Sequence, residues 1–307
     1  MAQKSAEKKL EKCYKIYEQI YDNPLISYSQ TAQNTGMARN TVARHVAAME
    51  GSIMYDPVIC LNPAQNYHEY VYFLMVKNPL SAYERLKALF PVISVAFGTW
   101  HLLLISDKQI DVSELEGYQE CILQEIKGVT HLSKVTTLNW EESMKKMRSM
   151  LHPPEEKSFL YEEMPPILWE DWEWALYHRF KHNARIPTAP LLKELEISRK
   201  QYNKWFSSLF DVASVQAAFY PLGVTKYLAV DFLFKSDYQR QVADVLGLLP
   251  STSLYFSAGD YLLARLFVPN GKKMRNLLIF IYDMKKKGFF IDFCSSTVIS
   301  ASERLIP

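Results

Sequence analysis

The stretch GMARNTVARHVAAME, residues 36–50, decides the fold of this chain, because its apolar and polar side chains separate onto two sides of a helix. The apolar side carries, at helical spacing, Val42, Val46 and Met49. Asn40 and Arg44 lie one turn apart on the opposite side, beside Arg39. We expect two further helices before this stretch, near 6–22 and 27–34, and a brief β pair after it, around 53–60. Together these elements predict a helix-turn-helix with a wing.

The chain repeats this arrangement in its second half. Residues 15–49 align with residues 175–209 without a gap, and the apolar positions of the two segments coincide. In the second copy we expect helices near 170–182, 188–195 and 198–210 and a β pair around 213–220. Later anchors follow with small slips, since Gly98 falls on Gly259 and Gly128 on Gly288. The repeat predicts two units of the same fold.

Behind each helical part, the hydropathy pattern predicts the order β-α-β-β-α-β. In the first unit the expected segments are a strand at 69–77, a helix within 81–90, strands at 92–97 and 100–106, a helix at 113–127 and a strand at 129–138. In the second unit they are 227–235, 237–249, 252–257, 261–268, 272–287 and 289–299. This order is that of a ferredoxin-like module. The predicted fold class is therefore α+β, with two repeats of a winged helix-turn-helix followed by a βαββαβ ferredoxin-like module.

These elements divide the chain into five predicted parts. They are a first winged helix-turn-helix at 1–62, a ferredoxin-like module at 63–140, a linker at 141–168, a second winged helix-turn-helix at 169–221 and a second module at 222–307. The linker is expected because its segment holds two Pro pairs and an acidic run.

A family resemblance follows from these motifs. The pattern A-x-x-x-G-M-x-x-x-T-V-x-R-H-V-x-x-M-E-G-x-I, from Ala32 to Ile53, resembles the helix-turn-helix of the leucine-responsive regulator and asparagine-operon regulator (Lrp/AsnC) family. The second copy keeps the layout but has Glu196 where the first has Gly36. The family usually places a hydroxyl residue at the N-cap of its recognition helix, which Ser198 matches and Ala38 does not. The resemblance implies a tandem transcription regulator that binds double-stranded DNA.

The second helix of a helix-turn-helix enters the major groove, where Arg suits guanine edges and Asn suits adenine. Seven residues on the polar sides of the two such helices are the predicted DNA contacts: Arg39, Asn40, Arg44, Arg199, Lys200, Asn203 and Lys204. The alternative interpretation is that these are ordinary solvated helix faces. The following modules and the repeat favour DNA binding.

The duplication has further consequences for partners. Because the two reading helices differ, we expect an operator whose two half-sites differ, whereas a symmetric dimer would read a palindrome. Each sheet module exposes one face, so we expect the two modules to pair within the chain. The sequence does not decide whether two chains then form a homodimer. The resemblance implies that the sheet modules can sense a small molecule. The loops at 98–101 and 259–262 resemble the effector-contacting turn of the family only loosely and do not identify this ligand.

Composition excludes several other classes. The chain has 35 Lys and Arg residues and 33 Asp and Glu residues, and the resulting net charge of +2 does not by itself indicate a nucleic-acid partner. The four cysteines are widely spaced without a C-x-x-C, as expected of reduced thiols in a cytosol. The N-terminus lacks an apolar signal segment, and the longest apolar run, 276–282, is too short to span a bilayer. We expect a cytoplasmic protein.

The sequence has few candidate catalytic or metal-binding residues. His178 and His182 have the spacing of a metal pair but lack a third ligand, and His101 is expected to be a satisfied strand histidine. The tryptophans of WEDWEW, residues 169–174, are expected to pack. There is no phosphate loop, G-x-G-x-x-G or G-x-S-x-G. The sequence therefore predicts no cofactor, no metal and no enzymatic activity.

Two alternatives stay open. Sirohaem decarboxylases resemble the same regulator architecture, sometimes as a fused pair, and hold a tetrapyrrole between paired sheet modules. Binding several propionates needs clustered basic side chains, but His68 stands alone at the start of the first module and Lys226 at the start of the second. The other alternative is an interaction scaffold whose helix-turn-helices no longer bind DNA.

Overall fold

The structure is a computed structural model that describes residues 2–90 and 92–302. Residue 1 and residues 303–307, at the ends of the first and last expected domains, lie outside the described residues. The chain forms two compact units. The first combines the chain up to Leu61 with Leu168–Thr225, and the second combines Asn62–Ile167 with the chain from Lys226 onward.

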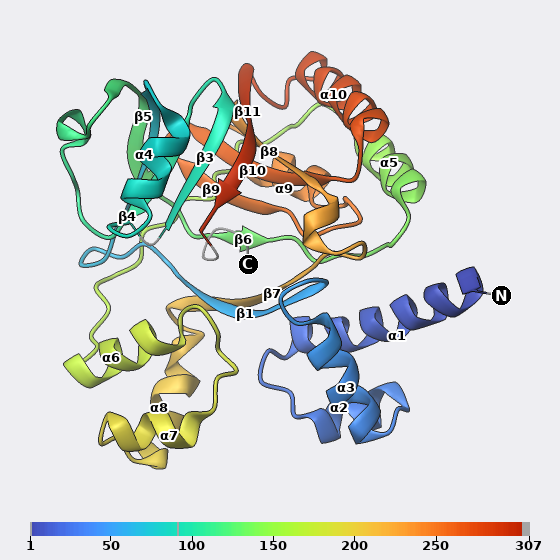
Figure 1. The fold of residues 1–307 in the computed structure, drawn as a ribbon. Helices are drawn as coiled ribbons and strands as arrows, with labels where there is room; N and C mark the ends of the chain where they lie inside the picture. Colours follow the sequence, from blue (N-terminus) through green and yellow to red (C-terminus); the bar gives the residue numbers. More distant parts are fainter. Residues whose placement is uncertain (1, 91, 303–307) are drawn as a thin grey trace. The chain divides into compact units, whose positions relative to one another are not determined.

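The first unit contains two sets of three helices, each followed by one strand (Figure 1). The first set is α1 (Ala2–Asp22), α2 (Tyr28–Thr35), α3 (Arg39–Met49) and β1 (Met54–Leu61). The second set is α6 (Asp171–Phe180), α7 (Thr188–Glu194), α8 (Arg199–Leu209) and β7 (Ala213–Phe219). All six helices lie where the sequence predicts them, because each set buries a continuous apolar stripe.

The strands β1 and β7 differ from the expected wings. They pair with each other, antiparallel, from Met54 opposite Phe219 to Leu61 opposite Ala213. Among the described residues, neither strand folds back into a hairpin behind its own reading helix. Each strand instead supplies the hydrogen-bond partners of the other strand's backbone groups. This pairing joins the two helical sets through a two-stranded ribbon.

The second unit is built on a nine-stranded sheet. Its first part holds β2 (Glu69–Val76), α4 (Pro79–Leu86), β3 (Val92–Gly98), β4 (Leu102–Ser106), the 3-10 turn η1 (Val112–Glu114), β5 (Tyr118–Lys127), β6 (His131–Leu132) and α5 (Trp140–Ser149). Its second part holds β8 (Leu228–Lys235), α9 (Gln239–Leu246), β9 (Leu254–Ala258), β10 (Tyr261–Val268), α10 (Gly271–Lys286) and β11 (Asp292–Ala301), after the 3-10 turn η2 (Val224–Lys226). Throughout residues 2–90 and 92–302, no helix combines the length and hydropathy needed to cross a bilayer.

The second part follows the predicted β-α-β-β-α-β order, but the first part does not. The segment 113–127, predicted as a helix, forms η1 and then β5, which pairs with β2 along its whole length. Two register shifts in that pairing, between Phe73 and Leu74 and between Met75 and Val76, interrupt the alternation of inward and outward residues. The apolar residues of β5 therefore lack the period of two that marks a strand. The expected strand at 129–138 is reduced to the two residues of β6.

The strands of the two parts join edge to edge within one sheet. β11 pairs with β3, and β9 pairs with β5 and β6 as well as with β10. At the first junction Gly98 lies opposite Ser296, and a Cβ on this glycine would come within 2.5 Å of the Ser295 carbonyl oxygen. The two modules thus join within the chain, but through hydrogen-bonded strand edges and not through the exposed sheet faces on which the expectation rested. Because β9 also pairs with β10, these edges close the sheet on itself.

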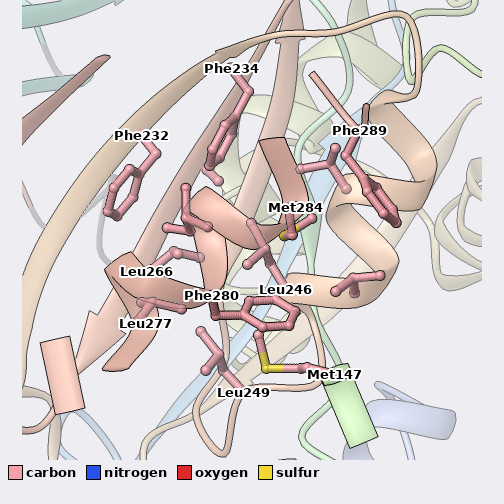
Figure 2. Close-up of a cluster of buried hydrophobic side chains, with 14 of the residues drawn as sticks. Met147, Phe232, Phe234, Leu246, Leu249, Leu266, Leu277, Phe280, Met284 and Phe289 are labelled. Atoms are coloured by element: carbon pink, nitrogen blue, oxygen red, sulfur yellow. The ribbon is translucent and has the colours of Figure 1, made fainter. Parts of the chain in front are cut away.

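The core under α9 and α10 also contains α5. Trp140, Met144 and Met147 of α5 are buried against the apolar side chains of β8, β10 and α10. Figure 2 shows Met147 beside Phe280 and Leu249 in this cluster. Asn139 caps α5, since its side chain accepts a hydrogen bond from the Glu141 backbone nitrogen at 2.9 Å. The segment expected to be a linker therefore begins within a core helix of the second unit.

A buried ion pair lies in the sheet. Arg265 on β10 and Asp231 on β8 are directly opposite, with side chains 1% and 0% exposed. The Arg265 guanidinium donates to both carboxylate oxygens, at 2.7 and 2.8 Å, and to Ser94 Oγ on β3 at 3.0 Å. The hydrogen bond to Ser94 connects the second part of the sheet to the first.

His131 predicts an acid-sensitive stability. Its Nε2 is buried and has no hydrogen-bond partner among the described residues. Burial, with smaller contributions from Arg240 and Lys127, lowers its pKa from 6.5 to about 4. Below pH 6.5 this histidine is protonated in the unfolded chain but stays neutral in the folded chain until the pH approaches 4. The free energy of unfolding should therefore fall between pH 6.5 and 4, by at most about 3 kcal/mol. Urea unfolding across this range should show the loss in the wild type and a smaller one in His131→Gln. An identical pH dependence in the variant would contradict the assignment.

Candidate nucleic-acid interface

The first predicted reading helix, α3, buries one face and exposes the other. Val42, Val46 and Met49 are at most 3% exposed and pack towards α1, which contributes Ile16 and Ile20 to the same core. The three predicted contact residues of this helix, Arg39, Asn40 and Arg44, are all exposed. Their neighbours on the helix include three small side chains, so a ligand can approach closely: Ala43, Ala47 and Ala48.

The second reading helix, α8, has the same arrangement on a more aromatic core. Tyr202, Trp205 and Leu209 are buried, and the Trp205 ring lies 6.0 Å from the ring of Phe180 on α6. The four predicted contact residues, Arg199, Lys200, Asn203 and Lys204, are exposed on the other side. The structure thus groups the seven predicted residues into two exposed faces, three on α3 and four on α8.

The turns that lead into α3 and α8 have matching geometry. Met37 N donates to Ala32 O at 3.0 Å, and Ile197 N donates to Leu192 O at 2.9 Å at the equivalent positions of the second copy. Gly36 has φ +70°, and Glu196, in the same place, has φ +55°. Glycine adopts this left-handed conformation freely, whereas for other L-residues it costs about 1–2 kcal/mol.

Exchanging residues at these two turns should move stability in opposite directions. Glu196→Gly is expected to stabilise the chain by up to about 1 kcal/mol, because it removes the strained φ. Gly36→Ala is expected to destabilise it by about 1 kcal/mol, although no atom lies within 4 Å of the added Cβ. Thermal melting of both variants checks this pair. A lower melting temperature for Glu196→Gly would contradict the shared turn geometry.

The N-caps of the two helices differ as the sequence predicts. Ser198 Oγ accepts a hydrogen bond from Gln201 N at 3.2 Å, and the Gln201 side chain accepts one from Ser198 N at 3.0 Å. This is a capping box, which satisfies two amides at the start of α8. Ala38 makes no such bond at the start of α3.

The exposed cationic side chains are not equally free to contact a ligand. Arg199 Nη1 donates to Thr188 Oγ1 at 2.6 Å, and its guanidinium lies 5.2 Å from the Tyr202 ring centre. Among the described residues, Arg39, Arg44, Lys200 and Lys204 form no ion pair. Burial, together with Arg44 and two lysines of α1, lowers the pKa of His45. His45 is therefore neutral at pH 7 and adds no charge to the face of α3.

The register of the ribbon has an approximate two-fold centre. This centre is at Asp56 and Pro57 of β1, which lie opposite Ala217 of β7. The flanking pairs are Tyr55 with Ala218 and Val58 with Gln216. Ala217 is the counterpart of Pro57 in the second copy, at the same offset that aligns α3 with α8. Positions that the sequence alignment makes equivalent in the two helical sets therefore meet at the centre of the antiparallel ribbon, as at a two-fold interface.

Contacts between the helical sets were not predicted from the sequence. Tyr17 on α1 stacks on Phe219 of β7 at 4.7 Å, and Arg185 after α6 bonds to the backbone of the first set. Arg185 stands where the first copy has Leu25, so the repeat gives no signal for it.

The other residues considered in the sequence have structural roles. His101 Nδ1 lies 2.8 Å from the Val76 carbonyl oxygen, which confirms that this histidine is satisfied, although it lies one residue before β4 and not in the strand. Trp169 and Trp174 pack at 5.0 Å, and Trp169 lies 6.1 Å from Trp205, which confirms packing in the second helical set. No group of three or more His, Cys, Asp or Glu side chains in the described ranges could hold a metal ion.

Comparison with protein families identifies the first helical set. The family described as winged helix-turn-helix DNA-binding matches residues 14–51, from α1 to the end of α3. Residues 14–51 are therefore similar to a winged helix-turn-helix DNA-binding domain, which supports DNA as a partner. No curated protein matches the sequence.

Comparison with solved structures finds a distant likeness to an enzyme. The siroheme decarboxylase NirDL matches with a TM-score of 0.49 and 12% identity, over 96% of each chain. Its complex with an iron-uroporphyrin III analogue matches with a TM-score of 0.47 and 14% identity, over 95% of each chain. The expectation that this chain is not an enzyme is contradicted by these matches. With TM-scores below 0.5, the likeness itself assigns no activity.

Proposed function

We propose that this protein is a sequence-specific DNA-binding transcription regulator of the Lrp/AsnC type, built from a tandem duplication of one helix-turn-helix and sheet unit. The observation that supports the proposal most is the pair of exposed faces on α3 and α8. Each carries cationic side chains and an asparagine directly opposite a buried apolar stripe. These are the side chains that read base edges and phosphates in a major groove.

The proposed contacts are Arg39, Asn40 and Arg44 in one half-site and Arg199, Lys200, Asn203 and Lys204 in the other. The α3 face has two cations and small alanine neighbours, whereas the α8 face has three cations, of which Arg199 is held by Thr188 and Tyr202. Two such different faces should prefer different bases. We therefore propose an operator with two unlike half-sites related by an approximate two-fold axis.

A small molecule bound to the sheet modules would be the effector of such a regulator. The second unit contains a pocket of about 420 Å³ near α9, whose polar lining residues are His152, Glu155, Glu156, Gln241 and Asp244. None of its lining residues belongs to the loops 98–101 and 259–262, which loosely resemble the effector-contacting turn of the family. Burial raises the pKa of Asp244. Three carboxyl groups beside one basic residue, His152, do not suit the several propionates of a tetrapyrrole, which need clustered cationic partners.

Selection of bound fragments from a random double-stranded DNA pool, at near-physiological ionic strength, tests the proposal. The expected result is enrichment of one motif with two unlike halves. A perfect palindrome would contradict the assignment of both faces to one complex. Absence of any enriched sequence would contradict the proposed function.

The visible absorption spectrum of the purified protein, recorded on the same sample, separates the alternatives. A tetrapyrrole band without DNA enrichment would support the decarboxylase alternative. Absence of both a tetrapyrrole band and an enriched DNA sequence would support an interaction scaffold.

A further inference from the structure

The segment between α6 and α7, residues 181–187, attaches the second helical set to the first. Its backbone and side chains contact the middle of β1 through three hydrogen bonds: Ile59 N to Lys181 O at 2.9 Å, Ala184 N to Pro57 O at 2.7 Å, and Asn183 Nδ2 to Asp56 Oδ2 at 2.8 Å. These bonds fix the segment at the approximate two-fold centre of the ribbon.

Arg185 extends this attachment to the helices of the first set. Its Nη1 donates to the Pro24 carbonyl oxygen, in the loop before α2, at 3.0 Å. Its guanidinium also lies 5.5 Å from the ring centre of Tyr28, the first residue of α2. The Arg185 backbone nitrogen donates to Asn183 Oδ1 at 2.7 Å, which orients the residue. One partly buried side chain thus makes a charge-assisted hydrogen bond and a cation–π contact with the first helix-turn-helix.

The attachment is one-sided. At the position equivalent to Arg185, the first copy has Leu25, which has no hydrogen-bond donor in its side chain and is 38% exposed. A symmetric pair of helical sets would make the contact twice. Besides the ribbon, the stack of Tyr17 on Phe219 and the three hydrogen bonds to β1, this arginine is the side chain that ties the segment after α6 to the loop before α2.

We propose that Arg185 is a positioning residue for DNA binding, which holds α3 and α8 at one separation so that the protein requires two half-sites at one spacing. This inference rests on the proposed function. Two readers held at a fixed distance bind a matching site as one bivalent ligand, and this advantage is lost when the sites do not match the span. Half-site spacing on DNA is set by the geometry of the paired readers.

A spacing series tests the inference. The selected operator is rebuilt with one to five base pairs inserted or removed between its half-sites, and binding is measured for each duplex and for each single half-site. The wild type should prefer one spacing. Arg185→Ala should lose about tenfold or more on that duplex, bind the altered spacings nearly as well, and keep its affinity for single half-sites. Arg185→Lys should restore part of the preference, because a lysine can still donate to Pro24 O.

Arg179→Ala is the matched control. It removes the same charge from α6, but Arg179 pairs with Glu194 inside the second helical set, at 2.7 Å. It should leave the spacing preference unchanged. An unchanged spacing profile in Arg185→Ala would overturn the inference, and so would an equal loss of binding to single half-sites, which would indicate a folding defect.

A distance measurement without DNA separates this inference from the proposed function. Spin labels at Ala47→Cys on α3 and Ser207→Cys on α8, both exposed sites, should give a narrow distance distribution in the wild type and a broader one in Arg185→Ala. Equal widths would overturn the inference even if DNA binds. Failure of the wild type to bind any DNA, with the broadening present, would contradict only the proposed function.

Discussion

Replacing Arg44 and Lys204 together by alanine is expected to lower the affinity for the selected operator by about 30-fold or more. Each side chain is exposed, has no described ion-pair partner and lies on a different reading helix. A base contact of this kind is worth about 1–3 kcal/mol, and effects at two separate half-sites should add. Titration of labelled operator at several salt concentrations measures the loss.

The same titration distinguishes the two kinds of contact. A residue that binds phosphate should weaken binding to all sequences and reduce the salt dependence of the binding constant by about one charge. A residue that binds a base should weaken binding mainly to the preferred sequence. Lys108→Ala with Lys287→Ala is the control, because both lysines are exposed in the second unit and the net charge changes equally. Equal losses in the double variant and its control would remove Arg44 and Lys204 from the interface.

Replacing Arg265 by alanine is expected to destabilise the second unit by about 3–5 kcal/mol. The substitution leaves the Asp231 carboxylate buried without its partner, and an unpaired buried charge is strongly unfavourable. Asp231→Ala should have a similar effect for the same reason. Urea unfolding, followed by the tryptophan signal, measures both variants.

A double variant and a surface control make this test specific. Arg265→Met with Asp231→Leu replaces the pair by apolar side chains and should recover most of the lost stability. Lys285→Ala removes the pairing of Lys285 with Asp292, at 2.7 Å, but these side chains are 38% and 72% exposed. An exposed pair of this kind contributes about 0–1 kcal/mol. A loss for Arg265→Ala no larger than that for Lys285→Ala would contradict the interpretation of a tightly paired buried site.

The helical sets could be predicted from the sequence because each helix buries one stripe whose spacing is visible in the chain. Val42, Val46 and Met49 show this directly, and the gapless alignment of residues 15–49 with 175–209 gives the second copy. The strand β5 could not be predicted, because its register shifts against β2 remove the alternation on which strand prediction depends. The helix α5 was missed because the segment was interpreted from its Pro pairs, which follow the helix.

The candidate site, too, could be predicted from the sequence only in part. Exposure of the seven proposed contact residues on α3 and α8 follows from helical periodicity alone. The pairing of β1 with β7 does not, because a strand that completes a wing and a strand that pairs with a distant copy have the same pattern. Arg185 and Asn183 act across the two copies, and a local pattern contains no information on such contacts.

Footprinting of the selected operator with hydroxyl radicals tests the central claim most directly, namely that α3 and α8 read the two halves of one site. The wild type should protect both halves. Arg44→Ala should lose protection in one half and Lys204→Ala in the other, with the opposite half retained at saturating protein. Loss of the same half in both variants, or unchanged protection in both, would contradict the account.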